Sequence, residues 1–111
     1  MTGALESLHF ATLELVRSTP IKQRLVSAYR RHLVSIDPDD LPAETRESFR
    51  QLMRSLQGVA PQPGENPVVA SVRKMSAQDA EECAASVVEI FGLTARAHFS
   101  VGRPTVEVSR A

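Results

Sequence analysis

The stretch from Thr19 to Pro42, TPIKQRLVSAYRRHLVSIDPDDLP, decides the fold class. Its apolar side chains recur every three or four residues with charged side chains between them, as on an amphipathic helix. This apolar stripe consists of Ile21, Leu25, Ala28, Tyr29, His32, Leu33 and Ile36. We predict a helix that begins at Thr19-Pro20, with the threonine hydroxyl as N-cap and the proline at the first helical position. It should end at Asp37-Pro38, because the residue before a proline avoids the α conformation.

Similar periodicity predicts helices on both sides of this segment. One is expected over about residues 4–17 and another over about residues 42–57, where Asp39 or Asp40 would cap the start and Gly58 would end the helix. The apolar positions assigned to these two helices are Leu5, Leu8, Thr12, Leu15, Val16, Phe49, Leu52, Met53 and Leu56.

Two further helices are predicted after a loop rich in proline and glycine. Asn66, followed by a proline, should cap a short helix over about residues 67–74. A pattern that resembles a capping box at Ser76 should start the last helix, which Gly92 would end. The residues expected to be buried on this last helix are Ala80, Cys83, Ala84, Val87, Val88 and Phe91.

After Gly92 the helical periodicity disappears, and only a brief alternation over residues 105–108 follows. We therefore predict an all-α fold, a small bundle of four to five helices that forms a single domain over residues 1–92. Residues 93–111 are expected to form an irregular tail, either flexible or an arm that docks on a partner.

Composition restricts the classes of function. The 111 residues include thirteen basic and thirteen acidic side chains, so no net charge would draw the protein to nucleic acid or anionic membranes. The single cysteine, Cys83, excludes a disulfide framework within the chain and favours a cytoplasmic location. No basic start with an apolar run marks a signal peptide, and no apolar stretch reaches the length of a membrane span.

His32 and Tyr29 are the first candidates for an interaction site, because both lie within the apolar stripe. A histidine there could respond to pH or bind a ligand. A histidine hydrogen-bonded to a backbone carbonyl or to Tyr29 is the more ordinary interpretation. We therefore expect no catalytic role for His32.

Arg46, Arg50 and Arg54 recur every four residues and would line one side of their helix. Together with other arginines they could form a phosphate-binding face. A solvated face paired with Glu44 and Glu47 is the more ordinary interpretation, and it agrees with the zero net charge.

No cofactor or metal is expected. Asp37, Asp39 and Asp40 fail the calcium-loop pattern, because proline and serine occupy the positions that need glycine and glutamate. Cys83 lacks a neighbouring histidine in any known signature and is interpreted as a small core residue. Phosphate-loop, zinc-protease and hydrolase motifs are absent from the sequence.

Several of these elements together resemble a group of small uncharacterised bacterial α-helical proteins. The resemblance is carried by the runs Leu25–Tyr29 and Ile36–Pro42, then by Arg46, Phe49, Leu52, and the run Arg73–Ser76. It covers about residues 17–92 and implies a bacterial, cytoplasmic setting, with no activity to carry over.

Three classes of function remain. The first is a non-enzymatic protein–protein interaction module that forms a homodimer or binds another protein, since so short a chain can hardly cover every apolar stripe by itself. The alternative is a small nucleic-acid-binding regulator that uses the arginine-lined helix. An enzyme is the third class, and no pair of groups in the sequence has the spacing of an acid–base or nucleophile–base set.

Overall fold

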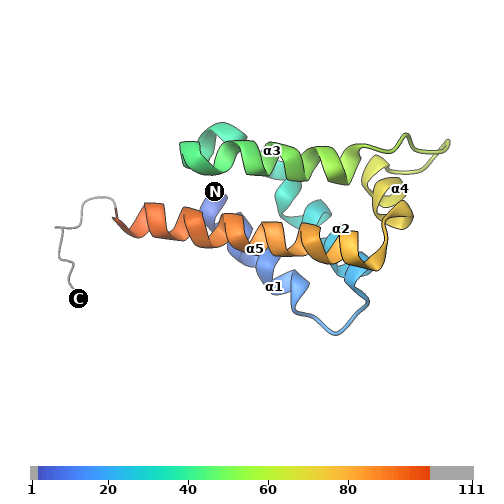
Figure 1. Cartoon of the computed structure of the whole chain (residues 1–111), viewed down its shortest axis with the longest axis horizontal. Coiled ribbons are helices and arrows are strands. Elements are labelled where there is room, and N and C mark those ends of the chain that lie inside the picture. Colours follow the sequence, from blue (N-terminus) through green and yellow to red (C-terminus); the bar gives the residue numbers. More distant parts are fainter. Residues whose placement is uncertain (1–2, 101–111) are drawn as a thin grey trace.

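A long C-terminal helix organises the fold, and three of the other helices pack against it (Figure 1). In the computed structural model, residues 3–100 are described and contain helices but no strand. In chain order the elements are α1 (Ala4–Leu15), α2 (Ile21–Arg31), the 3₁₀ turns η1 (Leu33–Ser35) and η2 (Pro38–Asp40), α3 (Ala43–Gln57), α4 (Pro67–Lys74) and α5 (Ala77–Ser100). The predicted all-α bundle is confirmed.

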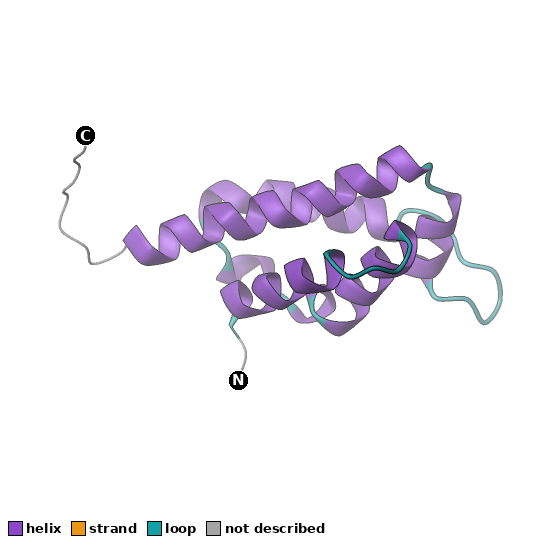
Figure 2. Ribbon diagram, turned by 90° about the horizontal axis from the view of Figure 1, so that it is seen from below, coloured by secondary structure: helices purple, strands orange, loops and turns teal. Residues whose placement is uncertain are grey.

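The helices enclose one apolar core. Helix α5 packs against α1, α2 and α3, while α4 closes one end of the bundle between α2 and α3. Figure 2 shows the same arrangement from below, with all regular structure helical. The largest fully buried side chains are Phe49, Leu8, Leu25, Leu33, Leu41, Leu56 and Ile90. Helical periodicity located the buried faces of these two segments correctly, because most of both predicted stripes is buried: Leu25, Ala28, Tyr29, Leu33, Ile36, Phe49, Leu52 and Leu56.

The predicted end of the last helix at Gly92 is wrong. Helix α5 continues without a break to Ser100. A β-carbon on Gly92 would meet no atom within 4 Å, and a glycine inside a helix costs only about 1 kcal/mol relative to alanine. Packing offsets that cost, since Thr94 in the continuing helix is 5% exposed. Residues 93–100 therefore belong to the helical bundle, and the rest of the predicted tail, residues 101–111, lies outside the described residues.

Helix α2 is shorter than predicted. Its α-helical part ends at Arg31, and the single turn η1 carries the chain on to Ile36. Pro38 explains why no helix extends through Asp37. We identify no sequence signal for the earlier break at His32.

The predicted helix caps are partly confirmed. Asn66 accepts a hydrogen bond from the Val68 N–H at 2.8 Å, and Ser76 accepts one from the Asp79 N–H at 2.9 Å. Thr19 does not cap α2, whose N-cap is Pro20. Neither Asp39 nor Asp40 caps α3, whose N-cap is Pro42.

Another aspartate, Asp37, acts as a cap instead. Its carboxylate accepts a hydrogen bond from the Asp39 N–H at 2.9 Å and so caps the short turn η2. This acidic segment therefore contributes to the local backbone structure, as the ordinary interpretation of the aspartates predicts.

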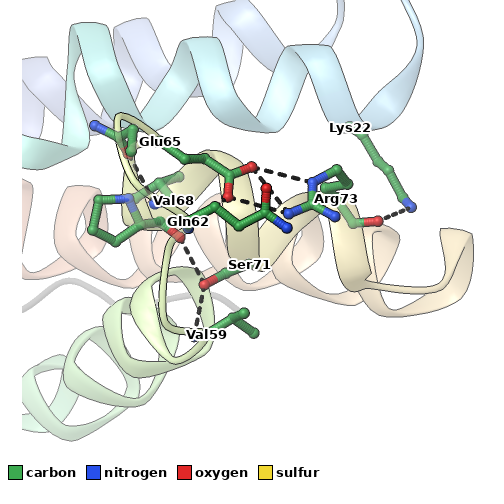
Figure 3. A network of polar contacts seen from close by, with 9 residues as sticks. Lys22, Val59, Gln62, Glu65, Val68, Ser71 and Arg73 are labelled. Atoms are coloured by element: carbon green, nitrogen blue, oxygen red, sulfur yellow. Dashed lines mark hydrogen bonds and ion pairs between the residues drawn. The ribbon is translucent and has the colours of Figure 1, made fainter.

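The long loop between α3 and α4 is fastened by polar contacts (Figure 3). The Ser71 hydroxyl accepts a hydrogen bond from the Val59 N–H at 2.9 Å. The Arg73 guanidinium donates to both carboxylate oxygens of Glu65, at 3.0 and 3.2 Å. Lys22 of α2 donates to the Arg73 carbonyl at 3.2 Å. Side chains of α4 therefore connect the loop to the bundle.

These contacts lower the pKa of the Glu65 carboxyl below its ordinary value of 4.5. The main cause is the hydrogen bond donated by the Gln62 N–H, and the hydrogen bond and charge of Arg73 act in the same direction. Desolvation of the Glu65 carboxylate raises its pKa, but this effect is smaller than the lowering by the other contacts.

Glu65→Gln is expected to destabilise the protein near neutral pH and to have little effect in acid. The folded-state pKa lies below the ordinary 4.5, so the carboxylate stabilises the fold above that pH and loses its contribution as the pH falls through the folded value. Urea unfolding of both proteins at about pH 7 and about pH 3 measures the difference. Glu44→Gln, at an exposed position on α3, is the control. A destabilisation by Glu65→Gln that is equal at both pH values would contradict this assignment.

Candidate interaction surface

Six large apolar side chains are exposed on α1, at its C-cap and on α5. They are Phe10 (41% exposed) and Leu13 (47%) on α1, Val16 (73%) at the C-cap, and Val88 (45%), Leu93 (37%) and Phe99 (60%) on α5. Val88 was predicted to be buried, which is wrong, because α5 turns Val87 and Ile90 into the core instead. Single exposed apolar residues are common, but a contiguous group is characteristic of a binding surface.

Helices α1 and α5 pack against one another and run antiparallel. Ala4 and Leu5 share a pocket with Thr94 and Ala97, which places the start of α1 beside the end of α5. His9 stacks on Phe91 farther along, with ring centroids 5.7 Å apart.

One further turn along both helices brings Leu13 of α1 level with Val88 of α5. We call this surface the α1/α5 face, and its members are His9, Phe10, Leu13, Val16, Val88 and Phe91.

A row of rings fixes part of the α1/α5 face. Phe10 stands next to His9, with centroids 5.3 Å apart, and stacks on His32 from the end of α2 at 5.8 Å. With the contact between His9 and Phe91, the row joins three helices. Rings restrained in this way lose little conformational freedom when a partner covers them.

His32 lies beside a buried carboxylate. The side chain of Glu14 is only 10% exposed, and its oxygens lie 3.4 Å from Arg17 Nε, 3.9 Å from Arg31 Nη1 and 3.8 Å from His32 Nε2. A carboxylate in such a position requires compensating charge. Sequence reasoning placed Glu14 off the buried stripe and did not foresee this cluster, because Arg31 and His32 come from a different part of the chain.

For His32 the sequence left open a hydrogen bond to a backbone carbonyl or to Tyr29, and within residues 3–100 the bond to Tyr29 is not formed. The Tyr29 hydroxyl instead accepts a bond from Gln57 Nε2 at 2.6 Å, which ties α2 to α3. Tyr29 is 8% exposed and is therefore a core residue. Of the two predicted interaction residues on this segment, only His32 borders the α1/α5 face.

The three arginines of α3 have different local contacts. Arg46 donates to the carbonyls of Leu41 and Asp39, at 3.0 and 3.3 Å, and so fastens the chain before α3. Arg54 pairs with Glu47 at 3.1 Å, as the ordinary interpretation predicts. Arg50 is exposed. These contacts add nothing to the nucleic-acid alternative, which stays a prediction.

A groove of about 500 Å³ lies between α3 and α5 and includes Cys83. Burial raises the pKa of the Cys83 thiol, and the negative charges of Asp79 and Glu82 raise it further. None of the residues that line the groove is basic or a histidine. A thiol with a raised pKa is a weaker nucleophile near neutral pH, because less of it is present as thiolate.

Metal binding and membrane insertion also find no support in the described part of the chain. Within residues 3–100, no three histidine, cysteine or acidic side chains come together in a way that could hold a metal ion. None of the helices in this range has the length and apolar character needed to cross a bilayer.

Comparison with known proteins adds no relative. No protein-family model matches the chain, and no curated protein and no solved structure matches it either.

Proposed function

We propose that this chain is a non-enzymatic protein–protein interaction module that associates with itself through the α1/α5 face. The observation that carries the proposal is the exposure of Phe10, Leu13, Val16 and Val88 on two adjacent helices. Covering such side chains provides about 25 cal/mol per Å² of apolar area removed from water. The zero net charge of the sequence also does little to keep two copies apart.

The surroundings of the α1/α5 face resemble those of protein interfaces. Apolar and aromatic side chains occupy its middle, and the charged side chains Glu6, Arg17 and Arg31 lie on or beside the same helices. An apolar centre with a charged rim is the usual composition of an interface between proteins. We place this module in the bacterial cytoplasm, on the grounds of its single cysteine and its resemblance to small bacterial proteins.

Val88→Glu is expected to weaken self-association at least about tenfold, because it puts a charge into the apolar centre of the α1/α5 face. Sedimentation velocity at micromolar concentration, in low and in high salt, measures the association. The wild-type dimer should persist in high salt, since apolar contacts are not screened.

Val34→Glu is the matched control. Val34 is 56% exposed, and it lines a pocket with Tyr29, Gln57 and Pro67, none of which belongs to α1 or α5. The control should associate like the wild type. A wild-type protein that is monomeric in both salts would contradict self-association, and equal losses in the two variants would contradict the placement on the α1/α5 face.

A further inference from the structure

The outward side of α1 carries four residues in a symmetrical order. Glu6, Phe10, Leu13 and Arg17 are separated by four, three and four residues, so they follow one side of the helix and the turn after it. Their exposure supports this placement. Glu6 is exposed, Phe10 and Leu13 are 41% and 47% exposed, and the Arg17 side chain is 65% exposed.

The order is self-complementary. The two end residues carry opposite charges, and the two residues between them are both apolar. Turning α1 end to end exchanges the position of Glu6 with that of Arg17, and the position of Phe10 with that of Leu13. A second α1 that runs antiparallel to the first would therefore meet a carboxylate with a guanidinium at each end and an apolar side chain with another in the middle. A two-fold interface requires this kind of self-complementarity.

We propose that two copies of this chain pair through antiparallel α1 helices, with Glu6 of each copy opposite Arg17 of the other and Phe10 opposite Leu13. This inference rests on the proposed function, and it adds the orientation and the register of the two copies. The two-fold axis passes between Phe10 and Leu13. Val88 and Phe91 of α5 flank this contact and extend its apolar area.

Contacts within the chain leave these groups available to a partner. Arg17 Nε lies 3.4 Å from Glu14, but Glu14 also has Arg31 and His32 beside it. Arg17 can therefore reach toward a second carboxylate without leaving Glu14 unpaired. Phe10 stacks on His32 and has His9 beside it, and these ring contacts restrain its position on the surface.

The opposite-charge pairs specify the register more than they strengthen the dimer. Exposed ion pairs between proteins contribute little affinity, while like charges that face one another act against the wrong pairing. A two-fold dimer contains the ion pair between Glu6 and Arg17 twice, so one charge reversal in the sequence replaces two ion pairs with two like-charge contacts. This doubling makes the register measurable.

Charge exchange between copies tests the proposal. Glu6→Arg places two arginines opposite one another at both ends of the contact, and Arg17→Glu does the same with two glutamates. Each variant alone is expected to dimerise about tenfold more weakly than wild type in low salt, and the difference should shrink in high salt. An equimolar mixture of the two variants should form a heterodimer, because every facing pair then has opposite charges. The double variant E6R/R17E should dimerise like wild type.

Glu44→Arg is the matched control for Glu6→Arg, because Glu6 and Glu44 both lie in the first turn of their helices. It should leave dimerisation unchanged, and circular dichroism of each variant checks that the fold is kept. A wild-type dimer whose variants show neither the mutual repulsion nor the recovery on mixing would overturn the antiparallel register while leaving self-association intact. A monomeric wild type would overturn the proposed function itself.

Discussion

Phe49→Ala is expected to lower the free energy of unfolding by about 3–5 kcal/mol. Phe49 is 1% exposed and is the largest fully buried side chain in the described part of the bundle. Its removal takes away the transfer free energy of the ring and leaves a cavity that α3 and its neighbours can fill only in part. Urea unfolding followed by circular dichroism gives the value.

Phe99→Ala is the matched control for this measurement. Phe99 is 60% exposed near the end of α5, so the same change of residue type should alter stability by less than about 0.5 kcal/mol. If Phe49→Ala cost no more than Phe99→Ala, the ring of Phe49 could not lie in a packed core.

The core of α2 and α3 could be predicted from the sequence because its signals are local. Leu25 and Phe49 each belong to an apolar stripe with charged residues on the opposite side, and Asn66 and Ser76 cap helices as their sequence context predicts. These signals involve only residues of one helix and its first turn, so they can be recognised without knowledge of the contacts between helices.

The course of α5 could not be predicted, for two reasons. Its many alanines leave more than one stripe open, so Val88 was wrongly assigned to the buried side and the buried Ile90 was missed. Gly92 is a usual helix end, but the helix beyond it packs beside the start of α1, where Thr94 and Ala97 lie near Ala4 and Leu5. Contacts between helices therefore outweighed the local signal.

The α1/α5 face was only partly visible in the sequence. His32 was singled out, but its neighbours Glu14 and Phe10 belong to another helix, and no spacing in the chain shows that they meet. The order of Glu6, Phe10, Leu13 and Arg17 is present in the sequence. Only the packing of α1 against α2 and α5 shows that this side of the helix faces outward.

Leu25→Ala is expected to lower the free energy of unfolding by about 2–5 kcal/mol at every protein concentration. Leu25 is fully buried on α2, which packs against α1, α4 and α5, so its removal leaves a cavity inside each copy of the chain. Thermal unfolding over a hundredfold range of concentration measures the effect.

Leu13→Ala removes the same atoms from the α1/α5 face, where Leu13 is 47% exposed. If two copies associate through this face, the variant loses stability only at concentrations where the wild type is dimeric, because a partner stabilises the folded state by mass action. At high dilution the melting temperatures of Leu13→Ala and wild type should converge, while that of Leu25→Ala stays low. A concentration-independent loss for Leu13→Ala would mean that Leu13 stabilises the single copy, and it would remove this residue from the proposed interface.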